Sequence, residues 1–403
     1  DQLDPKKTIF YQKTQEKVNQ IESKLIFFTL EINKLNQTKL NKSFKSKYLS
    51  WINIQRQFKK YQKNESIEKL LIDKSTTSSN AWIRLFDETM ARLRFDFNGK
   101  KLNETEVLDL LSSNDASKRE QAAEVFGKTL KDNIHLFSII TNTLSKDLQI
   151  ENSLRGFKSC DSSRHLSNQV DPEDVDCLVK TVKKNYADLS HRYYKYKAKV
   201  FNVKKLNFWD RNAPYPKQKS QNISWKTAKE IVEKAYKDFD VKVYDIIKLF
   251  FSNSWIHAPV SNGKMSGAFA HPATPSLHPY ILINYQNKVR DVMTLAHELG
   301  HGVHQYLAND KGLLLSDTPL TLAETASVFG EMLTFKSILK KANTDLQKKN
   351  ILRSKIEDML NTVIRQIAFY EFEKEVHTQR NNGELSVDEI NSIWLKTQKE
   401  SFG

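Results

Sequence analysis

The chain has 403 residues, of which 39% are hydrophobic, so it is long enough for two or more domains with sizeable cores. It contains 11 Gly and 9 Pro, and so few turn-forming residues in a long chain argue for mostly helical structure. The net charge of +15 comes from lysines spread along the chain without a concentrated arginine stripe, so we expect no nucleic-acid partner.

The sequence also gives expectations about membranes and cellular compartment. No apolar run approaches the roughly 18 residues that a membrane-spanning helix needs. Two cysteines, Cys160 and Cys177, cannot build a disulfide framework and fit a reducing compartment, so we expect a cytoplasmic protein that does not bind membranes. The start, DQLDPKK, has neither a Met nor an apolar signal segment, and we expect that the sequence begins inside a longer reading frame.

Residues 1 to 170 are predicted to form a succession of amphipathic helices. In the first of them, apolar residues recur at spacings of three and four, the period of one helical face: Val18, Ile21, Leu25, Phe28 and Ile32. Either Ser113 or Asp115 is expected to be the N-cap of a later helix. Gly and Ser interrupt the pattern in residues 152–168. We therefore predict an N-terminal helical region, 1–172, and a second region, 173–403.

The second region contains an irregular stretch that is followed by a short strand. Residues 257–279 hold four Pro and two Gly, which favours loop structure. The next six residues, YILINY, are mostly β-branched or aromatic, which predicts a strand. We expect this strand to lie at the edge of a sheet, where it can pair with the backbone of an extended peptide substrate.

The run from Val289 to Leu307 is predicted to be a helix with two different faces. At about 100° per residue, His301 lies about 40° and His304 about −20° from His297 around the helix axis. Apolar residues gather on the opposite side: Val292, Leu295, Leu299, Val303 and Tyr306. One face is therefore expected to pack in the core, while the other presents histidines.

His297, Glu298 and His301 form the pattern H-E-x-x-H, in which two imidazoles one turn apart hold a zinc ion. Glu298 flanks them and is the expected general base, which takes a proton from the attacking water. A catalytic zinc usually has three protein ligands, so a third is needed. Three ligands from one straight helix can hardly surround an ion, so we expect His304 to line the cleft or support a ligand, with a ligand role as the alternative.

A better third ligand lies in residues 316–335, which are predicted to form a helix with Thr318 as N-cap and Pro319 at its first position. Its interior is apolar or small apart from Glu324 and Glu331, which share one face. Burial disfavours a charged carboxylate unless a cation is near. We assign Glu324 as third zinc ligand and Glu331 as an acceptor behind the ligands; the alternative for each is a glutamate satisfied by a neighbouring Lys or Arg.

Four further residues near the histidines are singled out. Gly300 and Gly302 lie inside the helix, where each costs about 1 kcal/mol relative to Ala, so we expect another element or a ligand to approach closely there. His278 and Tyr280 precede the helix and are candidates for substrate contact or for support of the ligands.

Three stretches resemble the catalytic core of the oligoendopeptidase F branch of the thimet-oligopeptidase-like zinc metallopeptidases: GKMSGAFAHPATPSLHPYILINY, DVMTLAHELGHGVHQYL and DTPLTLAETASVFGEML. The resemblance extends to FFTLEIN, SRHLSN, LSHRYYKYKAKV, WDRNAPYP and IRQIAFYEFE, and so covers nearly the whole chain. It is specific because the spacing of the ligands and the residues around them agree together.

The resemblance implies a mainly α, multi-helical zincin-like fold, with a small β-sheet beside the active-site helix and a deep channel that admits short peptides. His297, His301 and Glu324 match the family's zinc ligands, and Glu298 matches its general base. The implied activity is a zinc-dependent endopeptidase, with one Zn²⁺ ion, that hydrolyses peptide bonds in short oligopeptides. The sequence does not indicate an oligomeric state.

The chain departs from the family at its ends. Family members continue past the position of Gly403 into a segment whose Tyr and His side chains donate hydrogen bonds to the oxyanion and the substrate, and their N-terminal part is longer. We therefore expect the catalytic region, 173–403, to be truncated at its C-terminal end. Loss of one oxyanion donor typically lowers turnover by about 10²- to 10³-fold. The second hypothesis is a fragment or remnant that binds zinc or peptide without turnover.

Overall fold

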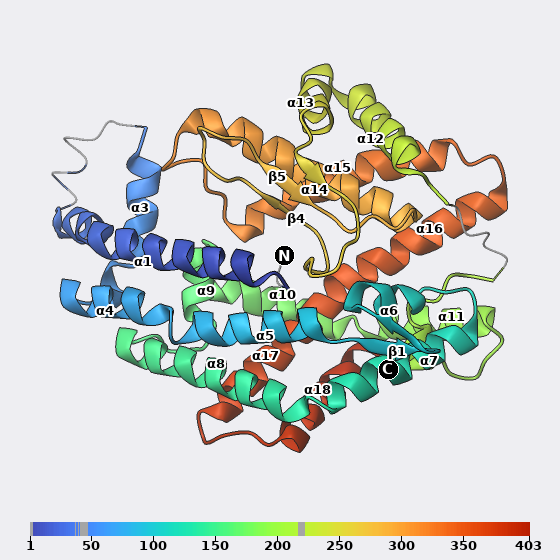
Figure 1. Ribbon diagram of the computed structural model, residues 1–403, viewed down its shortest axis with the longest axis horizontal. Helices are drawn as coiled ribbons and strands as arrows, with labels where there is room; N and C mark the ends of the chain where they lie inside the picture. The colour runs from blue at the N-terminus through green and yellow to red at the C-terminus, as the bar shows by residue number, and fades with distance from the viewer. Residues whose placement is uncertain (1–2, 37, 39, 41–46, 217–221) are drawn as a thin grey trace. The chain divides into compact units, whose positions relative to one another are not determined.

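Figure 1 shows the computed structural model of the chain, which describes residues 3–36, 38, 40, 47–216 and 222–403. The chain divides into two compact units: Asp1–Pro216 together with Ile356–Gly403, and Lys217–Lys355. Both consist mainly of helices, which confirms the predicted fold class. The boundary predicted at residue 172 falls inside the first unit, at the start of a helix. Within the described residues, no helix combines the length and apolar character needed to cross a membrane.

The first unit contains most of the helices and one small hairpin. Its helices are α1 (Pro5–Lys34), α3 (Leu49–Gln57), α4 (Glu65–Ser75), α5 (Ser79–Arg92), α6 (Glu104–Leu110), α7 (Ala116–Lys131), α8 (Ile134–Arg155), α9 (Ser162–Ser167), α10 (Pro172–Lys184), α11 (Arg192–Val200), α17 (Gln366–Arg380) and α18 (Val387–Phe402). The hairpin pairs β1 (Phe95–Phe97) with β2 (Lys100–Leu102) in antiparallel register. Single turns of 3₁₀- or π-helix lie at Lys59–Tyr61, Ala187–His191, Phe208–Asp210 and Asn361–Arg365.

Local signals in the sequence explain where several of these helices begin. The Asp115 carboxylate accepts hydrogen bonds from the backbone N–H groups of Ser117 (3.0 Å) and Lys118 (3.4 Å), so Asp115 is the N-cap of α7, one of the two residues predicted. α6 begins with a reciprocal pair of hydrogen bonds between Asn103 and Glu106. These caps satisfy backbone N–H groups that have no partner inside the helix.

α1 is a helix, as its apolar spacing predicts, but it packs through its polar side. Asn19 is buried and its Nδ2 donates to Ser75 Oγ (2.9 Å) and Thr76 Oγ1 (3.0 Å) at the end of α4. Four of the apolar residues that carry the spacing are exposed instead: Val18, Ile21, Leu25 and Phe28. The spacing of three and four therefore predicts the helix correctly and does not identify the side that is covered.

The second unit holds a three-stranded sheet and the helices around it. Its elements are α12 (Trp225–Phe239), α13 (Val241–Ser252), β3 (Ile256–His257), β4 (Phe269–His271), β5 (Tyr280–Leu282), α14 (Val289–Ala308), a 3₁₀ turn (Asn309–Lys311), α15 (Leu320–Lys340) and α16 (Asp345–Leu360), which continues into the first unit. The core of this unit includes residues of β5 and α14 that are almost inaccessible to water: Ile281, Val292, Leu295 and Leu299. Figure 1 shows β4 and β5 beside α14.

The order of the sheet corrects one expectation. β5 lies within YILINY, so the predicted strand is confirmed, but it is the middle strand of the order β3-β5-β4. It pairs in parallel with β3 and antiparallel with β4, so the expectation that it forms the edge is wrong. The two edge strands have two and three residues, which is too short for a recognisable alternating pattern.

Candidate metal centre

α14 carries the predicted histidines on one side and the core of the second unit on the other. In its first turn, the Asp291 carboxylate accepts hydrogen bonds from the N–H groups of Gln286 (2.7 Å) and Lys288 (2.9 Å), which precede the helix, and this fixes where the helix starts. Leu295 and Leu299 are fully buried. The helix is therefore held rigidly by its apolar side, and the opposite side is free to present functional groups.

α15 packs against α14 so closely that glycine is required on both helices. A Cβ atom on Gly300 of α14 would lie 2.5 Å from the carbonyl oxygen of Ala326 on α15. A Cβ atom on Gly330 of α15 would lie 2.7 Å from the carbonyl oxygen of Ala296 on α14. A Cβ atom on Gly302 would instead meet side chains, 2.7 Å from the ring of Phe250 on α13 and 3.3 Å from Ile281 on β5. The close approach expected at Gly300 and Gly302 is thus made by other elements of the protein.

The start of α15 differs from the prediction by one residue. The helix begins at Leu320 and Pro319 is the N-cap, where Thr318 was expected to be the cap and Pro319 the first helical residue. No side chain accepts a hydrogen bond at this cap. The shift leaves Glu324 in the first turns of α15, on the side that faces α14.

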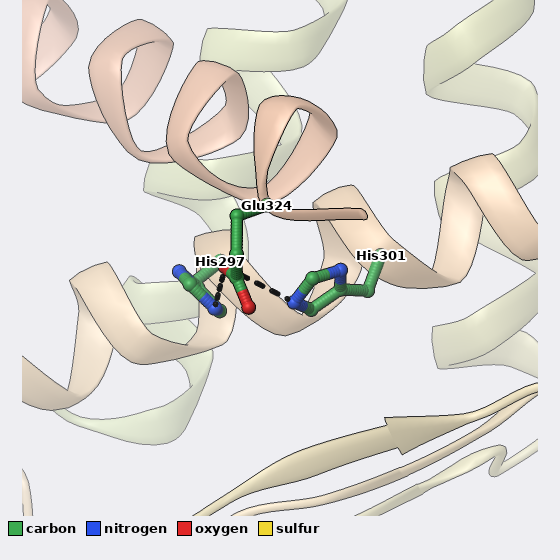
Figure 2. Close-up of side chains that lie close together, drawn as sticks. All are labelled: His297, His301 and Glu324. Atoms are coloured by element: carbon green, nitrogen blue, oxygen red, sulfur yellow. Dashed lines mark ion pairs between the residues drawn. The ribbon is translucent and has the colours of Figure 1, made fainter. Parts of the chain in front are cut away.

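His297, His301 and Glu324 come together between the two helices (Figure 2). One ligand atom from each residue lies within 4.8 Å of the others. Glu324 Oε2 is 3.3 Å from His297 Nε2 and 3.5 Å from His301 Nε2. In a tetrahedral site with bonds of about 2.0–2.2 Å, ligand atoms lie about 3.3–3.6 Å apart. The three side chains therefore fit a single divalent ion with nitrogen and oxygen ligands.

The surroundings of Glu324 favour the ionised form of its carboxylate. Hydrogen bonding to His301 lowers its pKa most, burial opposes this, and a further hydrogen bond from Ser327 helps bring the pKa to about 2. Ser327 is fully buried, and its Oγ donates to Glu324 Oε2 at 2.6 Å. Ser327 was not predicted, although its position three residues after Glu324 on the same helix places it on the same face.

Glu298 lies next to His297 in the sequence and differs from Glu324 in its surroundings. It is buried, and its Oε2 has no hydrogen-bond partner among the described residues. Burial raises its pKa above the ordinary value, while the neighbouring charges of His297 and His301 act in the opposite direction. A buried carboxylate oxygen without a partner, beside the ligand group, is free to accept a proton.

Glu331 supports His297 from behind. Its Oε1 lies 2.6 Å from His297 Nδ1, and its Oε2 lies 2.9 Å from Lys355 Nζ on α16. Burial alone would lower the pKa of His297, but the hydrogen bond to Glu331 and the nearby carboxylates raise it. Lys355 was not predicted, because it lies on another helix and nothing in the sequence connects it with Glu331.

The other three candidates lie outside the ligand group. His304 is half-buried on α14 but does not belong to the group of ligand atoms. His278 stacks on Trp255, with ring centroids 4.0 Å apart, and Trp255 in turn contacts Tyr306 on the apolar side of α14. Tyr280 contacts His278 and alternates along β5 with Ile281, which faces α14. His278 is therefore placed, through Trp255, with the apolar side of α14, whereas Tyr280 points to the other face of the sheet.

Known proteins resemble this chain over most of its length. Residues 109–403 match the family described as Peptidase family M3, and residues 31–95 match the one described as Oligopeptidase F. Oligopeptidase PepF of Bacillus subtilis is 29% identical over 313 residues, which are 76% of this chain and 46% of the relative. An oligoendopeptidase F homolog of Borreliella burgdorferi is 28% identical over 356 residues, 86% of this chain and 59% of the relative. The chain spans about half the length of these curated relatives.

Solved structures share the fold at lower sequence identity. PZ peptidase A, solved with an inhibitor, has a TM-score of 0.81 at 16% identity and covers 98% of this chain and 69% of its own. Oligoendopeptidase-F from Enterococcus faecium has a TM-score of 0.69 at 20% identity and covers 99% of this chain and 68% of its own. These structures show a shared fold. The match over residues 109–403, which are more than half of the chain, shows that the chain belongs to peptidase family M3.

Proposed function

We propose that this chain is a zinc-dependent endopeptidase that hydrolyses peptide bonds in short oligopeptides. The observation that carries the proposal is the meeting of His297, His301 and Glu324 beside the buried, unpartnered Oε2 of Glu298. Two nitrogens and one carboxylate oxygen suit zinc and leave one tetrahedral position for a reactant. When bound, the ion supplies an activated water and polarises the scissile carbonyl.

Three glutamate side chains, Glu298, Glu324 and Glu331, have the remaining roles. Glu298 Oε2 accepts the proton of the attacking water and returns it to the nitrogen of the leaving amine. Glu324, which is anionic, offsets part of the charge of the cation. Glu331 holds His297 by accepting the hydrogen bond from Nδ1, so that Nε2 is the nitrogen left for the ion.

The substrate is proposed to pair with β4, the edge strand beside α14. Ile281 of β5 donates its N–H to Trp255 on the β3 side, so its partner Ala270 on β4 does not pair with it through hydrogen bonds. The N–H and C=O groups of Ala270 therefore point to the outer edge, where the C=O accepts a hydrogen bond from Gln305 at 3.1 Å. An extended peptide could add to this edge through main-chain hydrogen bonds, which favours unfolded, short substrates.

Cleavage of a quenched fluorescent peptide tests the proposal. We expect activity that a chelator abolishes and added Zn²⁺ restores. Glu298→Gln should lower turnover by about 10²- to 10⁴-fold, the usual range for loss of a general base, while zinc binding persists. Cleavage that resists the chelator, or that survives in Glu298→Gln, would contradict the proposal.

A second candidate function follows from the share of the relatives that the chain covers, 46% and 59% in the two cases given. In this alternative the chain binds zinc or peptide without turnover. Stoichiometric zinc without cleavage would favour this alternative. We also propose a cytoplasmic location, which the two unpaired cysteines support.

A further inference from the structure

Lys355 lies behind the metal centre, where it contacts Glu331. Its Nζ is 2.9 Å from Glu331 Oε2. Only 11% of the Lys355 side chain and 16% of the Glu331 side chain are exposed, so both charges are largely withdrawn from water. In such surroundings the loss of one partner leaves the other charge uncompensated. The pair therefore holds Glu331 more firmly than an exposed ion pair would.

The two carboxylate oxygens of Glu331 have different partners, and this determines what His297 can do. An ionised carboxylate only accepts hydrogen bonds, so the nitrogen that it contacts, His297 Nδ1, carries the hydrogen. In the neutral imidazole the other nitrogen, Nε2, then keeps its lone pair, and it is the one that lies 3.3 Å from Glu324 Oε2 in the ligand group.

Another polar group near Glu331 is already engaged elsewhere. Tyr236 packs against Gly330, the residue before Glu331, but its hydroxyl donates to the carbonyl oxygen of Ala296 at 2.8 Å. The contacts of the Glu331 carboxylate are thus His297 on one oxygen and Lys355 on the other.

We propose that Lys355 is a positioning residue of the metal centre: its ammonium fixes the Glu331 carboxylate, which in turn fixes His297 with Nε2 toward the ion. This rests on the proposed function, because it takes His297, His301 and Glu324 to be the ligands. Lys355 acts from α16, a third helix, so the geometry of a site built on α14 and α15 depends on a contact from outside both.

Zinc affinity, measured by competition with a chromophoric chelator, tests whether Lys355 acts on His297 through Glu331. The four proteins compared are wild type, Lys355→Met, Glu331→Gln and the double variant; Met retains an apolar stem without the charge. We expect Lys355→Met to weaken zinc binding by about tenfold, the lower end of the effect of residues behind ligands. In the Glu331→Gln background the same substitution should change zinc affinity by less than about twofold, because the carboxylate through which Lys355 acts on His297 is then absent. Lys355→Arg should retain most of the affinity.

Lys264→Met is the matched control. Lys264 is also a half-buried lysine of the second unit, but it donates to the carbonyl oxygens of His257, Pro259 and Ile283 and not to a carboxylate. We expect this variant to keep the zinc affinity of the wild type.

Three results would overturn the role of Lys355: an unchanged affinity in Lys355→Met, a tighter affinity, or an equal loss in both backgrounds. The last would show a general effect on folding. Failure of the wild type to bind zinc would instead refute the proposed metal centre itself, and so the two failures are distinguishable.

Discussion

α1 and α14 carry the same kind of apolar spacing in the sequence, but the apolar side is buried in α14 and exposed in α1. On α14, Leu295 and Leu299 are 0% exposed. On α1, Leu25 of the corresponding apolar set is 56% exposed, and the buried residues are polar: Asn19, Ser23 and Asn33. The comparison teaches that a period of three and four indicates a helix, whereas the face that is covered depends on what packs against it.

The neighbours of the two helices explain the difference. α14 is surrounded by apolar groups of the sheet, α12, α13 and α15, which join it in one core. α1 meets α4 through hydrogen bonds from Asn19, and it also receives hydrogen bonds from Arg56 to the carbonyl oxygens of Ile32 and Leu35. Burial of a leucine contributes about 1.5–3 kcal/mol, and one hydrogen bond about 0.5–1.5 kcal/mol. The helix that carries the metal centre is therefore expected to be the more rigid of the two.

The largest effect is expected from truncation of the buried apolar face. Leu299→Ala should lower the free energy of unfolding by about 2–5 kcal/mol, because it leaves a cavity in the core of the second unit. Leu25→Ala, on the exposed face of α1, should change it by no more than about 0.5 kcal/mol. Urea unfolding measures both. Similar losses in the two variants would show that the contrast between the helices does not exist in solution.

Zinc binding should increase the difference in stability between α14 and α1. A ligand at 100 times its dissociation constant stabilises the state that binds it by about 2.7 kcal/mol. We expect added Zn²⁺ to slow amide hydrogen exchange in α14 and α15, which carry the three ligands, and a chelator to reverse this. Exchange in α1 should stay unchanged in the same experiment. Equal protection of α1 and α14 would argue against a specific site at His297, His301 and Glu324.

A smaller effect is expected where α14 meets α15. Gly300→Ala places a methyl group 2.5 Å from the carbonyl oxygen of Ala326, which overpacking data suggest costs about 1–3 kcal/mol. The same substitution at Gly127, inside α7, meets nothing within 4 Å and should stabilise the protein by about 0.5–1 kcal/mol. Thermal unfolding compares the two. Gly300→Ala should also weaken zinc binding, because Glu324 is carried by the helix that is displaced.

The sequence predicted those parts of the molecule that depend on local spacing. The helix expected from Val289 to Leu307 is observed from Val289 to Ala308, and the strand in YILINY is observed as β5. One turn of helix separates His297 from His301, so their shared face follows from the sequence alone. His297, Glu298 and His301 lie close together for this reason. Glu324 reaches them through the packing of α15 on α14, and its side chain is 53% exposed, so the burial from which it was predicted is not observed.

Features that depend on distant parts of the chain were not predictable in this way. The order of the sheet depends on β3 and β4, which are too short to show a pattern. Lys355 meets Glu331 across 24 residues of sequence, and many lysines could have taken its place. The exposed face of α1 is the clearest case, because its polar contacts to α4 involve residues more than 50 positions away.

The smallest predicted effect tests α1 directly. Asn19→Ala removes the donor that Ser75 and Thr76 accept from, and should destabilise the attachment of α1 by about 1 kcal/mol. This corresponds to about fivefold faster amide exchange in α1, whereas Leu25→Ala should leave exchange nearly unchanged. A polar substitution would then cost more than an apolar one, which is the reverse of the order expected on α14. If Leu25→Ala has the larger effect, another surface covers the apolar side of α1 in solution, and the two helices are alike after all.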